Sequence, residues 1–416
     1  MTDPDRDLEI DFGRLREHLD ALGRIGGRPD GGNSRLALTD ADREGRDLVV
    51  LWMRDLGLEV TVDRIGNIVA RQPWPEPHTP VMVGSHIDTV QAGGRYDGSY
   101  GVLAGLEVLA TVLEREIELR RPLAVSVFTN EEGSRFAPDM MGSLVYAGGL
   151  ALEVAMATRG IDGATVGEEL MRIGYAGSVP CPGSAPHAFV ELHIEQGPVL
   201  EHEGATIGVV EGVQGISWQE LTVRGQPNHA GTTPMTLRHD AGFVAASVAV
   251  VAREVAREIG GDQVATVGSL DLDPGLVNVI AGEARLTLDL RHTDDHRLSA
   301  AEDLMRQRVA ELFAAEGCVG EWRPLARFEP VAFDPRVVDL VERTAVAGRL
   351  STRRLSSGAG HDAQMMARIC PTGMIFVPSH HGVSHNPAEH TDDSDLEAGA
   401  NVLLRTVVAL AREEAP

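Results

Sequence analysis

Residues 80–90 have the sequence Pro80-Val81-Met82-Val83-Gly84-Ser85-His86-Ile87-Asp88-Thr89-Val90. The first half is a short apolar run, typical of a buried strand, and His86 follows where that strand ends. Apolar residues at helical spacing follow from Ser99, and a second apolar strand (residues 123–128) ends just before Glu131 and Glu132. A strand, a helix and a second strand in this order predict a mostly parallel α/β sheet. In such sheets, functional side chains collect at the carboxyl ends of the strands.

Length and composition indicate a globular protein of two domains. The chain has 416 residues, more than one typical core accommodates, with 43% hydrophobic and 24% charged residues. No run reaches the roughly 20 apolar residues of a membrane helix. The acidic N-terminal residues lack the features of a signal peptide, so we expect a cytoplasmic protein. The net charge of −25 argues against a nucleic-acid partner, and the three cysteines lack metal-binding spacing.

The middle of the chain changes character. From about residue 216 to 328 the expected order is strand, helix, strand, strand, helix, strand, which predicts a small α+β unit with an antiparallel sheet. The segments that follow resume the α/β pattern. We therefore predict a large α/β domain made of residues 1–214 and 329–416, with residues 215–328 inserted as a second domain.

Five separated clusters carry side chains that bind divalent metals: His86, Asp97, Glu131-Glu132, His193 and His385. Imidazole nitrogen and carboxylate oxygen both suit zinc and its neighbours. Five such groups are enough to hold two ions that share a carboxylate. A metal pair of this kind makes a water acidic and polarises a carbonyl. Hydrolysis of an amide-like bond is therefore the leading hypothesis.

Each cluster also has a simpler interpretation. A histidine after a strand, such as His86, is more often a surface residue, and His193 could be a core residue. Asp97 lies in a glycine-rich turn, where aspartate is common for backbone bonding. The adjacent Glu131 and Glu132 could belong to a solvated loop. Their functional interpretation gives one carboxylate to metal and the other to proton transfer.

Two further positions support a site. Asp88 lies two residues after His86 and is placed to orient its ring. His385 belongs to a loop rich in histidine, from His380 to His390, which favours contact with metal or substrate. Coincidence is a poor explanation for all five clusters together.

The segments GSHIDTV, GGRYDGSYGVLAGLEVL, TNEEGSRF, HIEQGPVLE, NHAGTTPM and SGAGHDA resemble the amidase branch of the M20 metallopeptidase family. This branch includes N-carbamoyl-L-amino-acid hydrolases, β-ureidopropionases of the metal-dependent type and allantoate amidohydrolases. The matches span about Gly84 to His390, and the domain order agrees. The resemblance implies two divalent ions, zinc or manganese with cobalt or nickel possible, and it implies that their ligands are His86, Asp97 (bridging), Glu132, His193 and His385.

The resemblance also implies roles for other residues. Glu131 would be the general base and then acid, and the inserted domain would be a lid that forms a homodimer, in which His229 could reach the site of the other subunit. The implied substrate contacts are Gln196, His229, Asn278, Arg291, Gly358 and His361. A guanidinium suits a carboxylate bidentately, so Arg291 would clamp the substrate. The alternative is a structural ion pair with Asp289, which shares its strand face.

The function that follows from the resemblance is cleavage of the ureido C–N bond of N-carbamoyl-L-amino acids or related ureido acids, with release of ammonia and carbon dioxide. Allantoate is the alternative substrate. An M20-type aminopeptidase or dipeptidase, or a non-catalytic metal-bound binding protein, are further alternatives. The intact Glu131 argues against the last of these.

Overall fold

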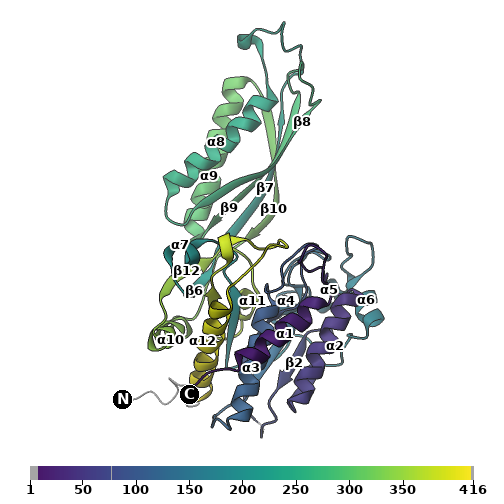
Figure 1. Ribbon diagram of the computed structural model, residues 1–416. Coiled ribbons are helices and arrows are strands. Elements are labelled where there is room, and N and C mark those ends of the chain that lie inside the picture. The colour runs from purple at the N-terminus through teal and green to yellow at the C-terminus, as the bar shows by residue number, and fades with distance from the viewer. Residues whose placement is uncertain (1–7, 76, 414–416) are drawn as a thin grey trace. The chain divides into compact units, whose positions relative to one another are not determined.

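The chain forms two units in the computed structural model, which describes residues 8–75 and 77–413 (Figure 1). The large unit comprises Met1–Gly212 and Ala332–Pro416, and the small unit comprises Val213–Val331. None of the described helices is both long and apolar enough to cross a membrane.

The large unit contains a nine-stranded sheet in the order β1-β2-β4-β3-β5-β13-β6-β11, with β12 also paired to β6. Its strands are β1 (Glu59–Val62), β2 (Ile68–Arg71), β3 (Val81–His86), β4 (Leu123–Phe128), β5 (Ala188–Ile194), β6 (Ile207–Val213), β11 (Val331–Ala332), β12 (Thr352–Ser357) and β13 (Thr372–Val377). The central strands β4, β3, β5 and β13 run parallel. The sheet is mixed, however, because β1, β2 and β6 pair antiparallel.

Helices cover this sheet and form most of the connections between its strands. They are α1 (Phe12–Arg24), α2 (Asp40–Asp55), α3 (Ser99–Glu114), α4 (Met141–Tyr146), α5 (Leu152–Ala157), α6 (Val166–Ile173), α7 (Val199–Glu203), α10 (Pro335–Ala347), α11 (Asp362–Met366), α12 (Asp393–Ala411) and the 3₁₀ turn η2 (His380–Gly382). Residues 99–112 of α3 are all buried, since this helix packs on β3, β4 and β5 and also against α1 and α12. Helix α2 is capped by Thr39, whose side chain accepts a hydrogen bond from the Asp42 N–H.

The small unit is a four-stranded antiparallel sheet in the order β10-β7-β9-β8, with two long helices. Its elements are β7 (Gly215–Arg224), the 3₁₀ turn η1 (Met235–Leu237), α8 (Ala241–Ile259), β8 (Val264–Asp273), β9 (Glu283–His292), α9 (Asp295–Glu316) and β10 (Val319–Phe328). Buried residues alternate along β9, including Leu286, Leu288 and Leu290, and they join the core beneath α8 and α9. The predicted β-α-β-β-α-β order and the α/β class of the large unit are both confirmed.

Candidate metal centre

Parallel strands bring the predicted residues to one edge of the main sheet. His86 is the last residue of β3, His193 is near the end of β5, and Glu131 follows β4 by three residues. Strand β3 pairs in parallel with both β4 and β5, so the three carboxyl ends lie together.

Asp97 lies between the histidines. Its Oδ1 is 3.0 Å from His193 Nε2 and 3.9 Å from His86 Nε2. Its Oδ2 is 3.1 Å from His385 Nε2. The two oxygens thus face different partners, and they place Asp97 in two groups with metal-binding geometry, His86–Asp97–His193 and Asp97–Glu132–His385.

The glutamate pair extends into the same cluster. Glu131 Oε2 is 3.3 Å from His86 Nε2, whereas Glu132 Oε2 is 3.4 Å from His385 Nε2. Burial, together with the charges of surrounding carboxylates, raises the pKa of both glutamates well above the ordinary value. Because they repel each other, the carboxylates remain ionised together only when positive charge is present.

Backbone carbonyls fix two of the imidazole rings. The Nδ1 atoms of His86 and His193 lie 2.9 Å from the carbonyls of Asp88 and Ile194, so each Nε2 faces Asp97. Burial lowers the pKa of His86 to about 4. Burial also disfavours the charged form of His193, but its hydrogen bond to Asp97 outweighs this and raises the pKa to about 9. Because Nδ1 of each ring contacts a backbone carbonyl, Nε2 is the atom available as a metal ligand.

Asp88 supports the glutamate pair as well as a histidine. Its carboxylate accepts hydrogen bonds from the backbone N–H groups of Glu131 and Glu132, each at 3.3 Å. The same carboxylate is 3.9 Å from His86 Nδ1, so the direct contact to the ring comes from the Asp88 carbonyl. Burial raises the pKa of Asp88 to about 7.

Glu389 also belongs to this cluster, although the sequence did not reveal it. Its Oε1 accepts from the N–H groups of Tyr96 and Asp97 at 3.1 and 3.2 Å, and its Oε2 accepts from Ser384 Oγ at 2.9 Å. It therefore connects the turn of Asp97 to the loop of His385. A Cβ on Gly94 would lie 1.9 Å from Glu389 Oε1, so the turn requires glycine there. Its position four residues after His385, in the same loop, was the available signal.

Gln196 also joins the cluster. Its Nε2 donates to Asp97 Oδ2 at 3.1 Å and lies 3.3 Å from His385 Nε2. A second glycine is required nearby, since Gly98 has φ +58° and a Cβ there would lie 2.3 Å from His86 Nε2. The glycine-rich turn thus brings the backbone up to the His86 ring.

A cavity of about 90 Å³ opens on this cluster. It is lined by Asp97, Glu131, Glu132, Asp139, His193, Gln196, Ala359, Gly360, His361 and His385. His361 is buried and its Nε2 lies 2.8 Å from Ser357 Oγ. Gly358 is exposed, and its neighbours Ala359 and Gly360 form the wall instead. Asp139 is a second lining residue that the sequence did not reveal.

The donor set fits divalent metal ions. Two groups of three imidazole and carboxylate donors share Asp97, with the donor atoms of each group within 4.8 Å of one another. Nitrogen and oxygen donors of this kind suit zinc and manganese. The lining residues of the cavity include four carboxylates and neither lysine nor arginine, so bound cations would offset the excess of negative charge.

The predicted residues of the small unit fall into two places. His229 bridges to Val279, and the Ala230 N–H donates to the Asn278 carbonyl, so His229 and Asn278 are neighbours. They lie beyond the Glu283 end of β9, whereas Arg291 lies near its other end. Eight residues of strand separate Glu283 from Arg291, which is roughly 26 Å. One copy of this unit cannot apply all three side chains to a single small substrate.

Arg291 has the ion pair that was the alternative to a substrate clamp. Its Nε and Nη2 donate to Asp289, the latter at 2.8 Å, and its guanidinium lies over Trp218 at 5.9 Å. His229 and Asn278 are exposed. The His229 Nδ1 accepts from the Gly231 N–H at 3.1 Å, which orients its ring.

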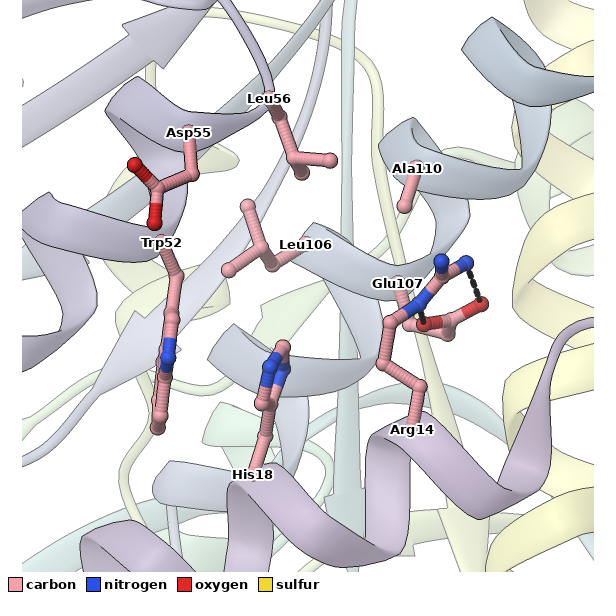
Figure 2. Close-up of a pocket in the computed structure, with 8 residues that line it drawn as sticks. All are labelled: Arg14, His18, Trp52, Asp55, Leu56, Leu106, Glu107 and Ala110. Atoms are coloured by element: carbon pink, nitrogen blue, oxygen red, sulfur yellow. Dashed lines mark hydrogen bonds and ion pairs between the residues drawn. The ribbon is translucent and has the colours of Figure 1, made fainter.

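A separate cavity of about 220 Å³ lies between α1, α2 and α3 (Figure 2). His18 stacks on Trp52 with ring centroids 4.0 Å apart. Arg14 forms an ion pair with Glu107 at 2.6 Å. None of the predicted site residues lines this cavity, so it is distinct from the candidate metal centre.

Comparison with known proteins identifies the class. Residues 82–409 match the model of peptidase family M20/M25/M40, and the chain belongs to this family. An N-carbamoyl-L-amino-acid amidohydrolase from Rhizobium meliloti is 39% identical over 412 residues, covering 99% of both chains. One from Geobacillus stearothermophilus is 40% identical, covering 96% of this chain and 99% of the relative.

Structural similarity places the chain more narrowly. The crystal structure of an amidase of the hydantoinase/carbamoylase family from Burkholderia multivorans has a TM-score of 0.96 and 45% identity, with 98% of this chain and 100% of that chain covered. An allantoate amidohydrolase from Bacillus subtilis is 34% identical and covers 95% of this chain and 97% of the relative. The protein is thus an amidohydrolase of the hydantoinase/carbamoylase branch, which acts on C–N bonds other than peptide bonds.

Proposed function

We propose that the protein hydrolyses the ureido group of N-carbamoyl-L-amino acids. The observation that carries this proposal is the pair of donor groups sharing Asp97, with Glu131 beside them, in a chain 39% identical over its length to an N-carbamoyl-L-amino-acid amidohydrolase. The overall reaction adds one water to the ureido carbonyl and yields the amino acid, carbon dioxide and ammonia.

Two divalent ions, zinc or manganese, would be held by His86, Asp97, Glu132, His193 and His385, with Asp97 shared. When bound, such ions supply Lewis-acid polarisation of the carbonyl and acidify a water. Gln196 and Glu389 hold Asp97 and the His385 loop in position through the hydrogen bonds described above.

Glu131 is the proposed general base. It is 7% exposed, and its backbone is fixed by the Asp88 carboxylate. The carboxylate accepts the proton of the attacking water and returns it to the leaving nitrogen. Its buried, acidic surroundings raise its pKa, and positive charge bound beside it would oppose this rise and favour the ionised form that the base requires.

Substrate recognition is proposed to involve a homodimer. Because His229 and Asn278 lie beyond the Glu283 end of β9, and that end is roughly 26 Å from Arg291, we assign the two sets to different reaction sites. His229 and Asn278 would contact the ureido group at the site of a second copy, where His229 stabilises the oxyanion. Arg291 would bind the substrate carboxylate at the other site. The substrate carboxylate would then join Asp289 as a partner of the guanidinium, or replace it.

Allantoate is the second candidate substrate, favoured by the allantoate amidohydrolase relative. It also offers a ureido group beside a carboxylate, so the same residues would bind it. The test is ammonia release from metal-reconstituted protein across N-carbamoyl-L-amino acids, N-carbamoyl-β-alanine, allantoate and dipeptides. We expect the N-carbamoyl-L-amino acids to have the highest kcat/KM. Preference for allantoate would select the alternative, and cleavage of dipeptides alone would overturn both.

A further inference from the structure

A further cluster of metal-binding side chains lies outside the candidate metal centre. It consists of Glu201 on α7 and the consecutive histidines His380 and His381 on η2. One donor atom from each lies within 4.8 Å of the others. His380 Nε2 is 3.9 Å from Glu201 Oε1, and His381 Nδ1 is 3.7 Å from Glu201 Oε2.

The backbone around His381 holds the side chains of this cluster close together. The His381 N–H donates to Glu201 Oε2 at 2.8 Å, which fixes the carboxylate against the turn. His381 has a left-handed conformation with φ 55° and ψ 16°, and this brings its ring beside that of His380, with centroids 4.0 Å apart. A left-handed backbone is unfavourable for most residues other than glycine, so the surrounding contacts must stabilise His381 in this conformation.

The spacing suits an ion better than a direct pair. Distances of 3.7 and 3.9 Å are too long for hydrogen bonds between imidazole and carboxylate. Donor atoms bound tetrahedrally to zinc at about 2.0–2.1 Å lie about 3.3 Å apart, so side-chain movements of less than about 1 Å would close the site. The His380 and His381 side chains are 50% and 75% exposed, which leaves room for an ion to enter and for water to complete its shell.

The cluster joins two segments that support the candidate metal centre. Helix α7 begins three residues after Gln196, and the Gln196 N–H donates to Ser379 Oγ at 2.9 Å, directly before η2. The His380 N–H donates to the His390 carbonyl at 2.8 Å, which closes the loop that carries His385. An ion bound here would hold this loop against α7.

We propose that Glu201, His380 and His381 form an accessory site for a divalent transition ion such as zinc, and that the bound ion restrains the loop of residues 379–390. Two imidazoles and one carboxylate form a three-ligand site with an open position. This proposal rests on the geometry of the large unit and does not require the proposed activity.

Zinc binding to tag-free protein tests the site. Equilibrium dialysis against zinc chloride, followed by elemental analysis, should show about one equivalent less in Glu201→Gln and in His381→Asn than in wild type. His202→Asn is the matched control, because His202 is exposed on the same helix but outside the cluster. It should retain the wild-type stoichiometry. Equal zinc content in wild type, Glu201→Gln and His381→Asn would overturn the site.

Hydrogen exchange tests the restraint of the loop. Zinc should slow amide exchange in residues 379–390 further in wild type than in Glu201→Gln, when both proteins are compared with and without excess zinc. The variants change exposed side chains, so circular dichroism should confirm an unchanged fold. Identical zinc protection of this loop in both proteins would contradict the restraint. Neither readout depends on ammonia release, so failure here is distinguishable from failure of the proposed function.

Discussion

The candidate metal centre and the inserted unit present their predicted residues in different ways. Five candidate ligands of the large unit converge on one sheet edge, where Asp97 contacts both His193 and His385. The candidate substrate contacts of the small unit are divided between the two ends of β9. The five candidate ligands and Glu131 make up the chemical half of the site, and they come together within one chain. We propose that the recognition half, formed by His229, Asn278 and Arg291, draws on more than one copy of the small unit.

The difference has a physical origin. Parallel strands deliver their carboxyl ends to one edge, so residues far apart in sequence meet there. An antiparallel sheet with strands of ten residues spreads residues at its two ends over the full strand length. The predictions below test each half, from the largest expected effect to the smallest.

Replacement of the proposed base tests the chemical half. Glu131→Gln should lower kcat by about 10²- to 10⁴-fold, because the amide cannot accept the proton. Metal content, measured by elemental analysis, should stay at the wild-type level. Glu153→Gln, which changes an exposed glutamate on α5, is the control. Near-wild-type turnover of Glu131→Gln would rule out its role as base.

Core truncation in the small unit tests whether the metal centre is independent of it. Leu286 is fully buried beneath α8 and α9, so Leu286→Ala should lower the free energy of unfolding by about 2–5 kcal/mol. Urea denaturation measures this loss, with the exposed Val250→Ala as control. Metal content of the folded variant should not change. A parallel loss of metal would show that the two units are coupled.

Loss of the Glu389 carboxylate tests the support of Asp97. In Glu389→Gln the amide oxygen carries no full charge, so its hydrogen bonds to the Tyr96 and Asp97 N–H groups are weaker and metal Kd should rise about 10- to 100-fold. Competition with a chelator measures this change, and the exposed Glu397→Gln is the control. Unchanged affinity would show that Glu389 has no positioning role.

Replacement of Arg291 tests whether this side chain binds the substrate carboxylate or only pairs with Asp289. Arg291→Ala should raise KM about 10-fold or more for N-carbamoyl-L-amino acids, because a charge-assisted hydrogen bond is lost. The corresponding N-carbamoyl amino-acid amides should be affected less. An equal rise for both substrate classes would assign Arg291 to its ion pair with Asp289 alone.

Much of the fold was predictable from local patterns. Alternating apolar runs and helical spacing indicated the β-α-β-β-α-β unit, in which α8 is the first helix. The antiparallel outer strands of the main sheet were not predicted, since an apolar run does not show in which direction its strand runs. The short helices α4–α6 were missed because their apolar faces span only one or two turns.

The sequence indicated the site less completely than the fold. Strand ends explained why His86 and Glu131 would lie together. Glu389 and Asp139 were missed because a loop acid resembles any solvated acid until the chain closes around it. The choice between ion pair and clamp at Arg291 could not be made from alternation alone. The separation of His229 from Arg291 required the strand register.

The most direct test of the divided site is complementation between two inactive variants. An equimolar mixture of Glu131→Gln and His229→Ala chains, dissociated and reassociated, should recover about one quarter of wild-type ammonia release. Half of the dimers would be mixed, and one of their two sites would combine Glu131 of one chain with His229 of the other. Activity of the mixture no higher than the mean of the two variants alone would show that each chain uses its own His229, and would contradict the account.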